Sequence, residues 1–316
     1  MTHEPDRWPS LPLDSWRETY ETLHLWTQIV GKIRMECMPW INHSWHVPLY
    51  VSARGLATSL IPREPHDFEI EFDFHEHRLR IATTRATARS FDLEPMTVAD
   101  FHSRTMEALH ALDLEVAISP LPVEIPDPIL PFHEDRSHGS YDRAAVERFW
   151  RILLASHRVL TRFRAEYIGK ASPVHFFWGA FDLAASRFSG REAPRHPGGA
   201  PNCADWVMEE AYSHEVSSAG FWPGGGPLPF PLFYSYVYPE PDRFRSAAIR
   251  PEGAFYDETM GEFVLPYDLV RAAEAPERML LEFYRSTYEA AADLGGWDRK
   301  ALERESGSVP PDRTTP

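Results

Sequence analysis

The chain has 316 residues, and 32 lysines and arginines stand against 47 aspartates and glutamates, so the formal net charge is −15. This acidity argues against a protein that wraps nucleic acid or docks on an anionic membrane, because both need clusters of basic side chains. The longest near-apolar stretches fall far short of the roughly 18 residues that a membrane span needs. We therefore expect neither nucleic acid nor membrane as a partner.

Cysteine content and the start of the chain both favour the cytoplasm. Two cysteines, Cys37 and Cys203, fit a reducing compartment better than a disulfide framework. Residues 1–12 are polar and contain no apolar h-region, so we expect no signal peptide. Only three of the 32 basic residues are lysines. Because arginine codons are GC-rich, a GC-rich bacterial genome is the simplest source of this bias.

Proline clusters divide the chain. The five prolines from Pro120 to Pro131 predict an extended connector, because proline fixes φ and cannot donate a ladder hydrogen bond. Clusters at 194–201 and 223–231 combine proline with glycine and predict long ordered loops, which often carry function. We expect two α+β halves, which pack as separate domains or as one, and a polar, disordered tail: 13–125, 126–297 and 298–316.

The N-terminal half reads as a helix, several antiparallel strands, a second helix and a last strand. Apolar and polar side chains alternate over 68–75, and this period of two predicts a strand with one buried face. Asp14 is the expected N-cap of the first helix, and Thr97 with Asp100 resembles a capping box. The expected helices are 14–33 and 97–112, and the expected strands are 46–61, 68–75, 79–83, 90–93 and 116–118.

The C-terminal half repeats this order. Its last helix begins at Pro276, a favoured first helical residue, and ends at Gly295. Together the halves predict an α+β fold with mostly antiparallel, curved sheets and four main helices. A duplicated helix–sheet–helix unit is one explanation of the order, although shared residues are few. The expected long helix is 142–168, and the strands are 174–189, 211–221, 233–238 and 263–265.

Polar residues inside aromatic strands are the first candidates for chemistry. His175, Trp178 and Asp182 lie in the aromatic run 173–183. A buried carboxylate needs a charged or hydrogen-bonding partner, so Asp182 indicates either an internal salt bridge or turn contact, or a place in a pocket. Arg187 is expected on the opposite strand face.

A second candidate region runs from Ala211 to the three glycines 224–226. Small residues at 217–220 leave room for another backbone or a ligand. His214 and Glu215 are adjacent in a predicted strand and therefore point to opposite faces. The glycines lack a Walker or Rossmann spacing, which favours a connecting loop over a phosphate cradle.

Aromatic and basic side chains near these segments complete the expected ligand contacts. Tyr234, Tyr236 and Tyr238 alternate on one strand face and could form an aromatic wall over a ligand. The expected ligand-binding residues are Trp45, Arg54, Trp178, Glu215, Trp222 and Tyr236. Packing at the edge of the core explains the alternating tyrosines of 234–238 equally well. No G-x-S-x-G elbow occurs, and neither cysteine has a protease context, so hydrolase mechanisms of those types have no support.

A metal site is a further hypothesis. His43 and His46 are three residues apart, so a turn could aim both at one ion, with His175 and His214 joining them. With Asp182 or Glu215 as a carboxylate ligand, the set would suit zinc or non-haem iron. The alternative is that these histidines make ordinary structural hydrogen bonds, since the chain has 15 histidines and chance pairs are expected.

Four segments resemble a bacterial family of unknown function. The resemblance extends from about residue 22 to residue 297, nearly the whole chain, and implies one family-wide unit rather than a fusion. It carries no activity, cofactor or catalytic residue. The segments are Leu23–Lys32, His46–Val51, Pro173–Asp182 and Tyr212–Gly226.

Two functions follow from these observations. The first is a small-molecule-binding protein or enzyme with an aromatic pocket, in which His175 or His214 is the general base and a metal acts as Lewis acid or water activator. The second is a non-catalytic structural or interaction protein, in one version a homodimer with tyrosine-rich strands at its interface. The polar lining expected for the first is His43, His46, Arg54, His175, Asp182, His214 and Glu215.

Overall fold

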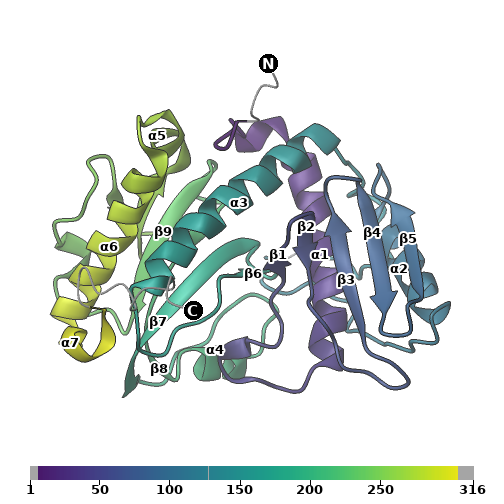
Figure 1. Cartoon of the computed structure of the whole chain (residues 1–316), viewed down its shortest axis with the longest axis horizontal. Coiled ribbons are helices and arrows are strands. Elements are labelled where there is room, and N and C mark those ends of the chain that lie inside the picture. The colour runs from purple at the N-terminus through teal and green to yellow at the C-terminus, as the bar shows by residue number, and fades with distance from the viewer. Residues whose placement is uncertain (1–5, 127, 305–316) are drawn as a thin grey trace, which may run out of the picture.

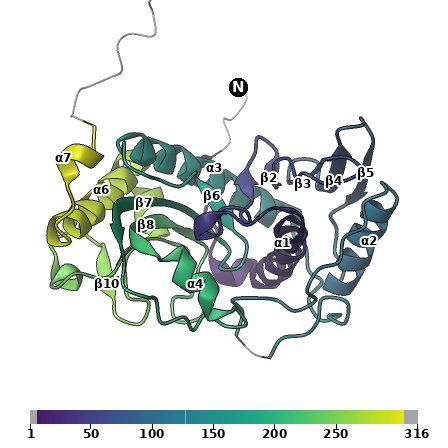
Figure 2. The ribbon, with the colours of Figure 1, turned by 90° about the horizontal axis from the view of Figure 1, so that it is seen from below.

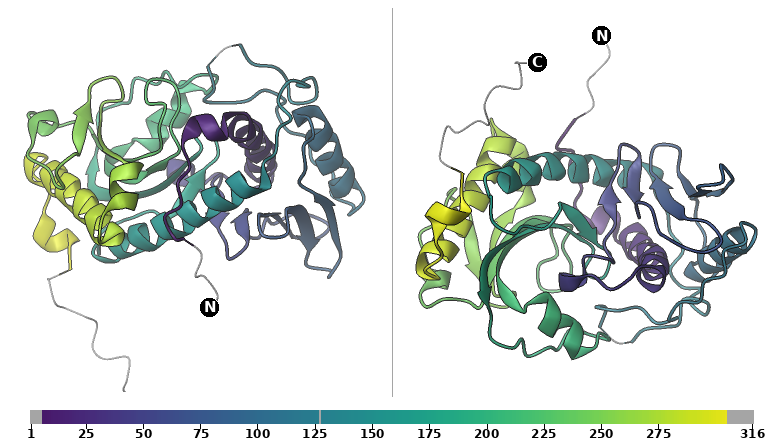
Figure 3. Two further views of the ribbon diagram at one scale, coloured as in Figure 1. Left: turned by 90° about the horizontal axis from the view of Figure 1, so that it is seen from above. Right: turned by 60° about the horizontal axis from the view of Figure 1, so that its bottom comes forward.

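Two antiparallel sheets and seven α-helices form the part of the chain, residues 6–126 and 128–304, that the computed structural model describes (Figure 1). The N-terminal sheet has the strand order β1-β2-β3-β4-β5, and the C-terminal sheet has the order β10-β11-β9-β8-β7-β6. The two sheets lie toward opposite ends of the molecule (Figures 1 and 3). This arrangement confirms the expected α+β fold.

The N-terminal half follows its predicted order with local differences. Thr97 caps α2 as expected, and its hydroxyl accepts a hydrogen bond from the Asp100 backbone N–H at 3.1 Å. Asp14 is not the N-cap of α1, because it lies in a preceding 3₁₀ turn and pairs with Arg17 at 2.5 Å. The expected strand 46–61 is two short strands, and 116–118 is irregular. The elements are α1 (Arg17–Cys37), β1 (Tyr50–Val51), β2 (Gly55–Ala57), β3 (Phe68–Asp73), β4 (Arg78–Thr83), β5 (Ala88–Asp92) and α2 (Val98–His110).

The C-terminal half contains the longest helix and the larger sheet. Its expected strand 174–189 is a hairpin, because Phe181 adopts a φ of 62° and turns the chain between β6 and β7. The last long helix begins at Pro276, as predicted. The elements are α3 (Arg143–Ala165), β6 (His175–Phe177), β7 (Asp182–Glu192), α4 (Asp205–Ala211), β8 (His214–Trp222), β9 (Leu232–Tyr238), β10 (Phe255–Asp257), β11 (Glu262–Pro266), α5 (Tyr267–Ala272), α6 (Pro276–Leu294) and α7 (Arg299–Leu302).

The two halves share one hydrophobic core. A continuous cluster of buried side chains runs from Trp8 to Trp297 and includes residues of both sheets. Leu49 and Phe176 exchange two backbone hydrogen bonds of 2.9 and 2.7 Å, and so join the segment before β1 to β6. No helix in the described ranges is long and apolar enough to cross a membrane.

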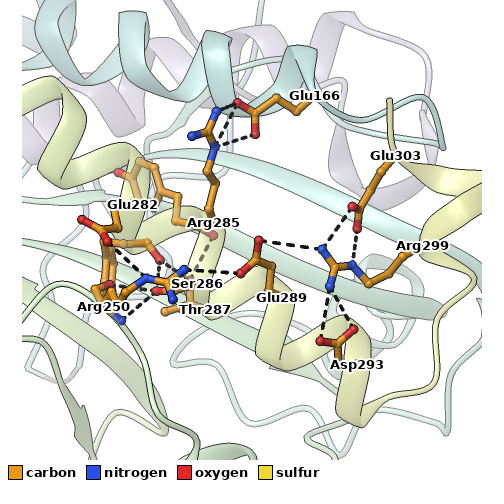
Figure 4. Close-up of polar contacts among 12 residues, drawn as sticks. Glu166, Arg250, Glu282, Arg285, Ser286, Thr287, Glu289, Asp293, Arg299 and Glu303 are labelled. Carbon is orange, nitrogen blue, oxygen red and sulfur yellow. Dashed lines mark hydrogen bonds and ion pairs between the residues drawn. The ribbon is translucent and has the colours of Figure 1, made fainter. Parts of the chain in front are cut away.

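The two faces of the C-terminal sheet have different surroundings. Leu183, Phe221 and Phe233 are paired across β7, β8 and β9 and lie fully buried on the face that packs against α3 and α6. On the outside of these helices, ion pairs of α6 reach Glu166, which caps α3, and Arg299 of α7 (Figure 4). The helical side of the sheet is therefore a packed layer, and any ligand space must lie on the other side.

Candidate functional site

A cavity of about 1310 Å³ lies against the other face of the C-terminal sheet. Its floor is this sheet, and its walls come from α1, the proline-rich connector, the β6–β7 turn, the loop before α4, and α4 itself. Figure 2 shows α4 across the sheet from α3. All three proline clusters of the sequence contribute to the lining, so segments that are far apart in the sequence surround one space.

The floor consists of every second residue of neighbouring strands, because alternate side chains of a strand point to the same face. Ser186 of β7 pairs with Ser218 of β8, and Ser218 pairs with Tyr236 of β9. In the next row Gly220 pairs with Tyr234, and a Cβ on this glycine would lie 2.5 Å from the tyrosine hydroxyl. Small residues in β7 and β8 thus leave the volume that the tyrosines of β9 and the cavity occupy.

Three of the carboxyl groups that line the cavity have raised pKa values. Asp182 begins β7, Glu262 begins β11, and Glu124 comes from the connector. Burial raises the pKa of Asp182 to about 6, although a hydrogen bond donated by the Tyr234 hydroxyl opposes the rise. Burial, and then the charge of Asp182, raises the pKa of Glu124 to about 7 and that of Glu262 to about 8. Carboxyl groups of this kind can both donate and accept protons near neutral pH.

The connector is held in place by residues far from it in sequence. The side-chain amide of Gln28 in α1 donates to the Val123 carbonyl at 2.8 Å and accepts from the Val123 N–H at 2.9 Å. Glu124 then adopts a φ of 60°, and its N–H donates to the Pro201 carbonyl at 2.7 Å. A Cβ on Gly179 would lie 2.1 Å from a Glu124 carboxylate oxygen, so the carboxyl group rests against the β6–β7 turn.

Aromatic rings form much of the remaining lining. Trp178 and Trp222 donate their indole N–H groups to the carbonyls of Val47 and Ala180, at 2.8 and 3.1 Å, which fixes both rings. The hydroxyls of Tyr212 and Tyr236 lie 2.8 Å apart. Burial raises the pKa of Tyr212 to about 12 and that of Tyr236 well above its usual value, so both hydroxyls stay protonated at neutral pH. The site therefore offers apolar ring faces together with a few polar groups.

Some of the residues predicted from the sequence line this cavity. They are Asp182, Trp178, Trp222, Tyr236 and His43.

The other predicted residues lie elsewhere in the described part of the chain. His175 is fully buried on the opposite strand face, both ring nitrogens lack a hydrogen-bond partner among the described residues, and burial lowers its pKa to about 3. Arg54 pairs with Asp73 in the N-terminal sheet, and Glu215 pairs with Arg191 at 2.6 Å. Of the seven polar side chains expected in one pocket, His43 and Asp182 line this cavity. The strand pleat turns His175 to the opposite face, and Arg54 lies between β1 and β2, beside the other sheet.

Two of the remaining candidates, Trp45 and His214, contact the ring of His43, which lines the cavity. Trp45 and His43 have ring centroids 5.3 Å apart, and His214 lies edge-on to His43 at 5.8 Å. The Nδ1 of His43 is 2.9 Å from the Ala211 carbonyl, and its Nε2 is 2.8 Å from the Lys170 ammonium. His46 instead contacts the backbone of Ile41 at 3.3 Å.

The histidines are not gathered into one metal site. Both ring nitrogens of His43 have protein partners, and the His46 ring faces a different segment. Within the described ranges, no group of three or more His, Cys, Asp or Glu side chains is placed to hold a metal ion.

Sequence reasoning missed several lining residues, above all Glu124 and Glu262. Glu124 stands in a loop, where no periodicity marks a side chain as inward. Glu262 directly precedes the apolar run 263–265, and extending that strand by one residue would have placed it beside Tyr236. Tyr234 belongs to the alternating tyrosines of 234–238, and this alternation does not indicate the hydrogen bond that its hydroxyl donates to Asp182.

Comparison with known proteins shows a family but no activity. No curated protein matches the chain, and no solved structure matches it. A model of a protein family matches residues 8–304, nearly the full length. The chain therefore belongs to DUF5996, a family of unknown function.

Proposed function

We propose that the protein binds a small organic molecule in the cavity between the C-terminal sheet, α1 and α4. The observation that carries this proposal is the combination of a large aromatic cavity with three carboxyl groups, those of Glu124, Asp182 and Glu262, that have no ionic partner among the described residues. Ligand pockets typically measure about 300–1,000 Å³, are mostly apolar, and contain a few placed polar groups. At about 1310 Å³, this cavity has room for a drug-sized ligand.

The energetics of the cavity support a binding role over a purely structural one. Protein interiors pack to a density of about 0.75, so a large space inside the fold forfeits contacts that a structural protein would keep. Burial also raises the pKa values of Asp182, Glu124 and Glu262, so their ionisation opposes folding. Features that lower folding stability in this way are typical of sites where the residues serve function and not stability. The non-catalytic structural alternative leaves them without a reason.

We also propose a bacterial cytoplasm as the setting. Cys37 and Cys203 are both free and half-buried, as expected for thiols in a reducing compartment.

Binding of the neutral dye Nile red tests the proposed function, because its fluorescence rises in apolar surroundings. We expect the dye to bind one site per chain. Met208→Trp in α4 and Met260→Trp beside β11 both fill the cavity and should weaken binding at least tenfold. The exposed Thr161→Trp in α3 is the control and should bind as the wild type does. Equal binding by the wild type and both filled variants would refute the proposal.

A further inference from the structure

We infer that the ligand is an organic cation, an amine or quaternary ammonium with an apolar body, whose charged group lies among Asp182, Glu124 and Glu262. The inference rests on the proposed small-molecule function and adds the chemical class of the ligand.

The three carboxyl groups and Tyr212 line the same cavity. The charges of Glu262, Glu124 and Asp182 all add to the effect of burial in raising the pKa of the Tyr212 hydroxyl. Asp182 in turn interacts with both Glu124 and Glu262. The carboxyl groups of Glu124 and Glu262 make no hydrogen bond or ion pair with any residue in the described ranges, and both line the cavity, Glu124 as an exposed and Glu262 as a half-buried residue. A ligand in the cavity can therefore reach both carboxyl groups.

No described side chain supplies the missing positive charge. His24 of α1 is held neutral because burial lowers its pKa to about 4, and its ring bonds the Gly179 carbonyl at 2.8 Å. Arg17, at the cavity wall, pairs with Asp14. Burial lowers the pKa of Lys32, and the group that opposes this shift electrostatically is Cys203. The other residues that interact electrostatically with the three carboxyl groups are all acidic or neutral. They are Asp257, Cys203, Tyr212, Tyr234 and Tyr236.

The aromatic lining selects an organic cation over a metal ion. Quaternary ammonium and alkylammonium groups are recognised by aromatic faces, because the negative face of the ring attracts the cation. Trp178, Trp222 and Tyr234 present rings in the same cavity as the carboxyl groups. The described acids are not placed to ligate one metal, but they suit a larger, diffuse charge.

Protonation gives the inference a second consequence. With pKa values of about 6, 7 and 8, the three carboxyl groups share protons with solvent at pH 7. A bound cation stabilises their ionised forms, so binding should release protons near pH 7 and fewer at pH 9, where they are already ionised.

Isothermal titration with three probes of matched shape tests the charge preference at pH 8. The probes are 4-phenylbutylamine, 4-phenylbutan-1-ol and 4-phenylbutyrate. We expect the amine to bind at least tenfold more tightly than the alcohol, and the carboxylate to bind most weakly. Titrating the amine at pH 7 in phosphate and in Tris, whose ionisation enthalpies differ, measures the protons released.

Variants then assign the preference to the carboxyl groups. Asp182→Asn, Glu124→Gln and Glu262→Gln should each weaken amine binding several-fold and leave alcohol binding within twofold. Glu258→Gln, which removes an exposed carboxyl group outside the cavity, should change neither.

Each outcome separates this inference from the proposed function. Equal binding of amine and alcohol, or tighter binding of the carboxylate, overturns the cation assignment while Nile red binding still supports a ligand cavity. Absence of binding by all three probes, with Nile red still bound, also overturns it. Loss of cavity-dependent Nile red binding refutes the proposed function itself.

Discussion

Asp182→Asn is expected to stabilise the protein at high pH and to have little effect at low pH. The substitution removes the charge of Asp182 but keeps an oxygen that can accept the hydrogen bond from Tyr234. Asp182 is 8% exposed, and burial raises its pKa from 3.8 to about 6. A raised folded-state pKa means that the native state holds the proton more tightly than the unfolded chain does. The stabilising contribution is therefore complete below pH 3.8 and is lost as the pH rises through about 6.

The shift gives the size of the effect. A difference of about two pH units, at 1.36 kcal/mol each, corresponds to roughly 3 kcal/mol. We expect the stability advantage of Asp182→Asn over the wild type to grow by about this amount between pH 4 and pH 8.

Urea unfolding followed by tryptophan fluorescence measures this difference across the pH range. Asp242→Asn, at an exposed position, controls for the change in net charge. A difference between Asp182→Asn and the wild type that stays constant with pH, or that shrinks as the pH rises, would refute the reasoning that burial destabilises this carboxylate.

Three further substitutions test the packing around the cavity. Gly31→Ala in α1 should destabilise the protein by about 2 kcal/mol in urea, although alanine normally favours a helix. The reason is that its Cβ would lie 2.2 Å from the Trp178 indole nitrogen, and a gain in stability would contradict that contact. His175→Phe should add about 1–3 kcal/mol at pH 7, because it removes two buried nitrogens without partners. Burial lowers the pKa of this imidazole to about 3, so the wild type loses stability as the pH falls from 6.5 towards 3. His175→Phe should lose less stability over this pH range. A lower stability of the variant at pH 7 would show that the ring has a partner that the protein needs. Gln28→Leu removes both side-chain bonds to Val123 and should weaken 4-phenylbutylamine binding several-fold by calorimetry; unchanged binding would show that the connector holds Glu124 without them.

Helices and strands whose ends or faces are determined by neighbouring residues were predicted from periodicity, capping residues and proline. The alternation over 68–75 found β3, the Thr97 cap located the start of α2, and Pro276 began α6 as expected. The hairpin inside 174–189 was not predicted, because Phe181 adopts a left-handed conformation that is unusual for a non-glycine residue and follows from tertiary packing. Short elements such as β10 and α5 gave too few residues for a periodicity to appear.

An acidic residue of the candidate site could be predicted where a charged side chain interrupts an apolar, aromatic segment of the sequence. Asp182 stood out as a carboxylate in an aromatic run, and the structure places it in the cavity. His175 stood out in the same way, yet the pleat of β6 buries it on the other face. Glu124 could not be placed from the sequence, because its position depends on Gln28 and Pro201, 96 and 77 residues away.

The origin of the cavity walls has a consequence for how the chain can be divided. Residues 20–25 of α1, the connector and α4 supply walls, and β7, β8, β9 and β11 supply the floor, so the binding space exists only when segments from both halves are folded together. A ligand bound there stabilises the native state by RT ln(1 + [L]/Kd), and it does so for the whole chain at once. Fragments separated at the connector should therefore bind no ligand alone, and a bound ligand should draw such fragments back into one folded complex.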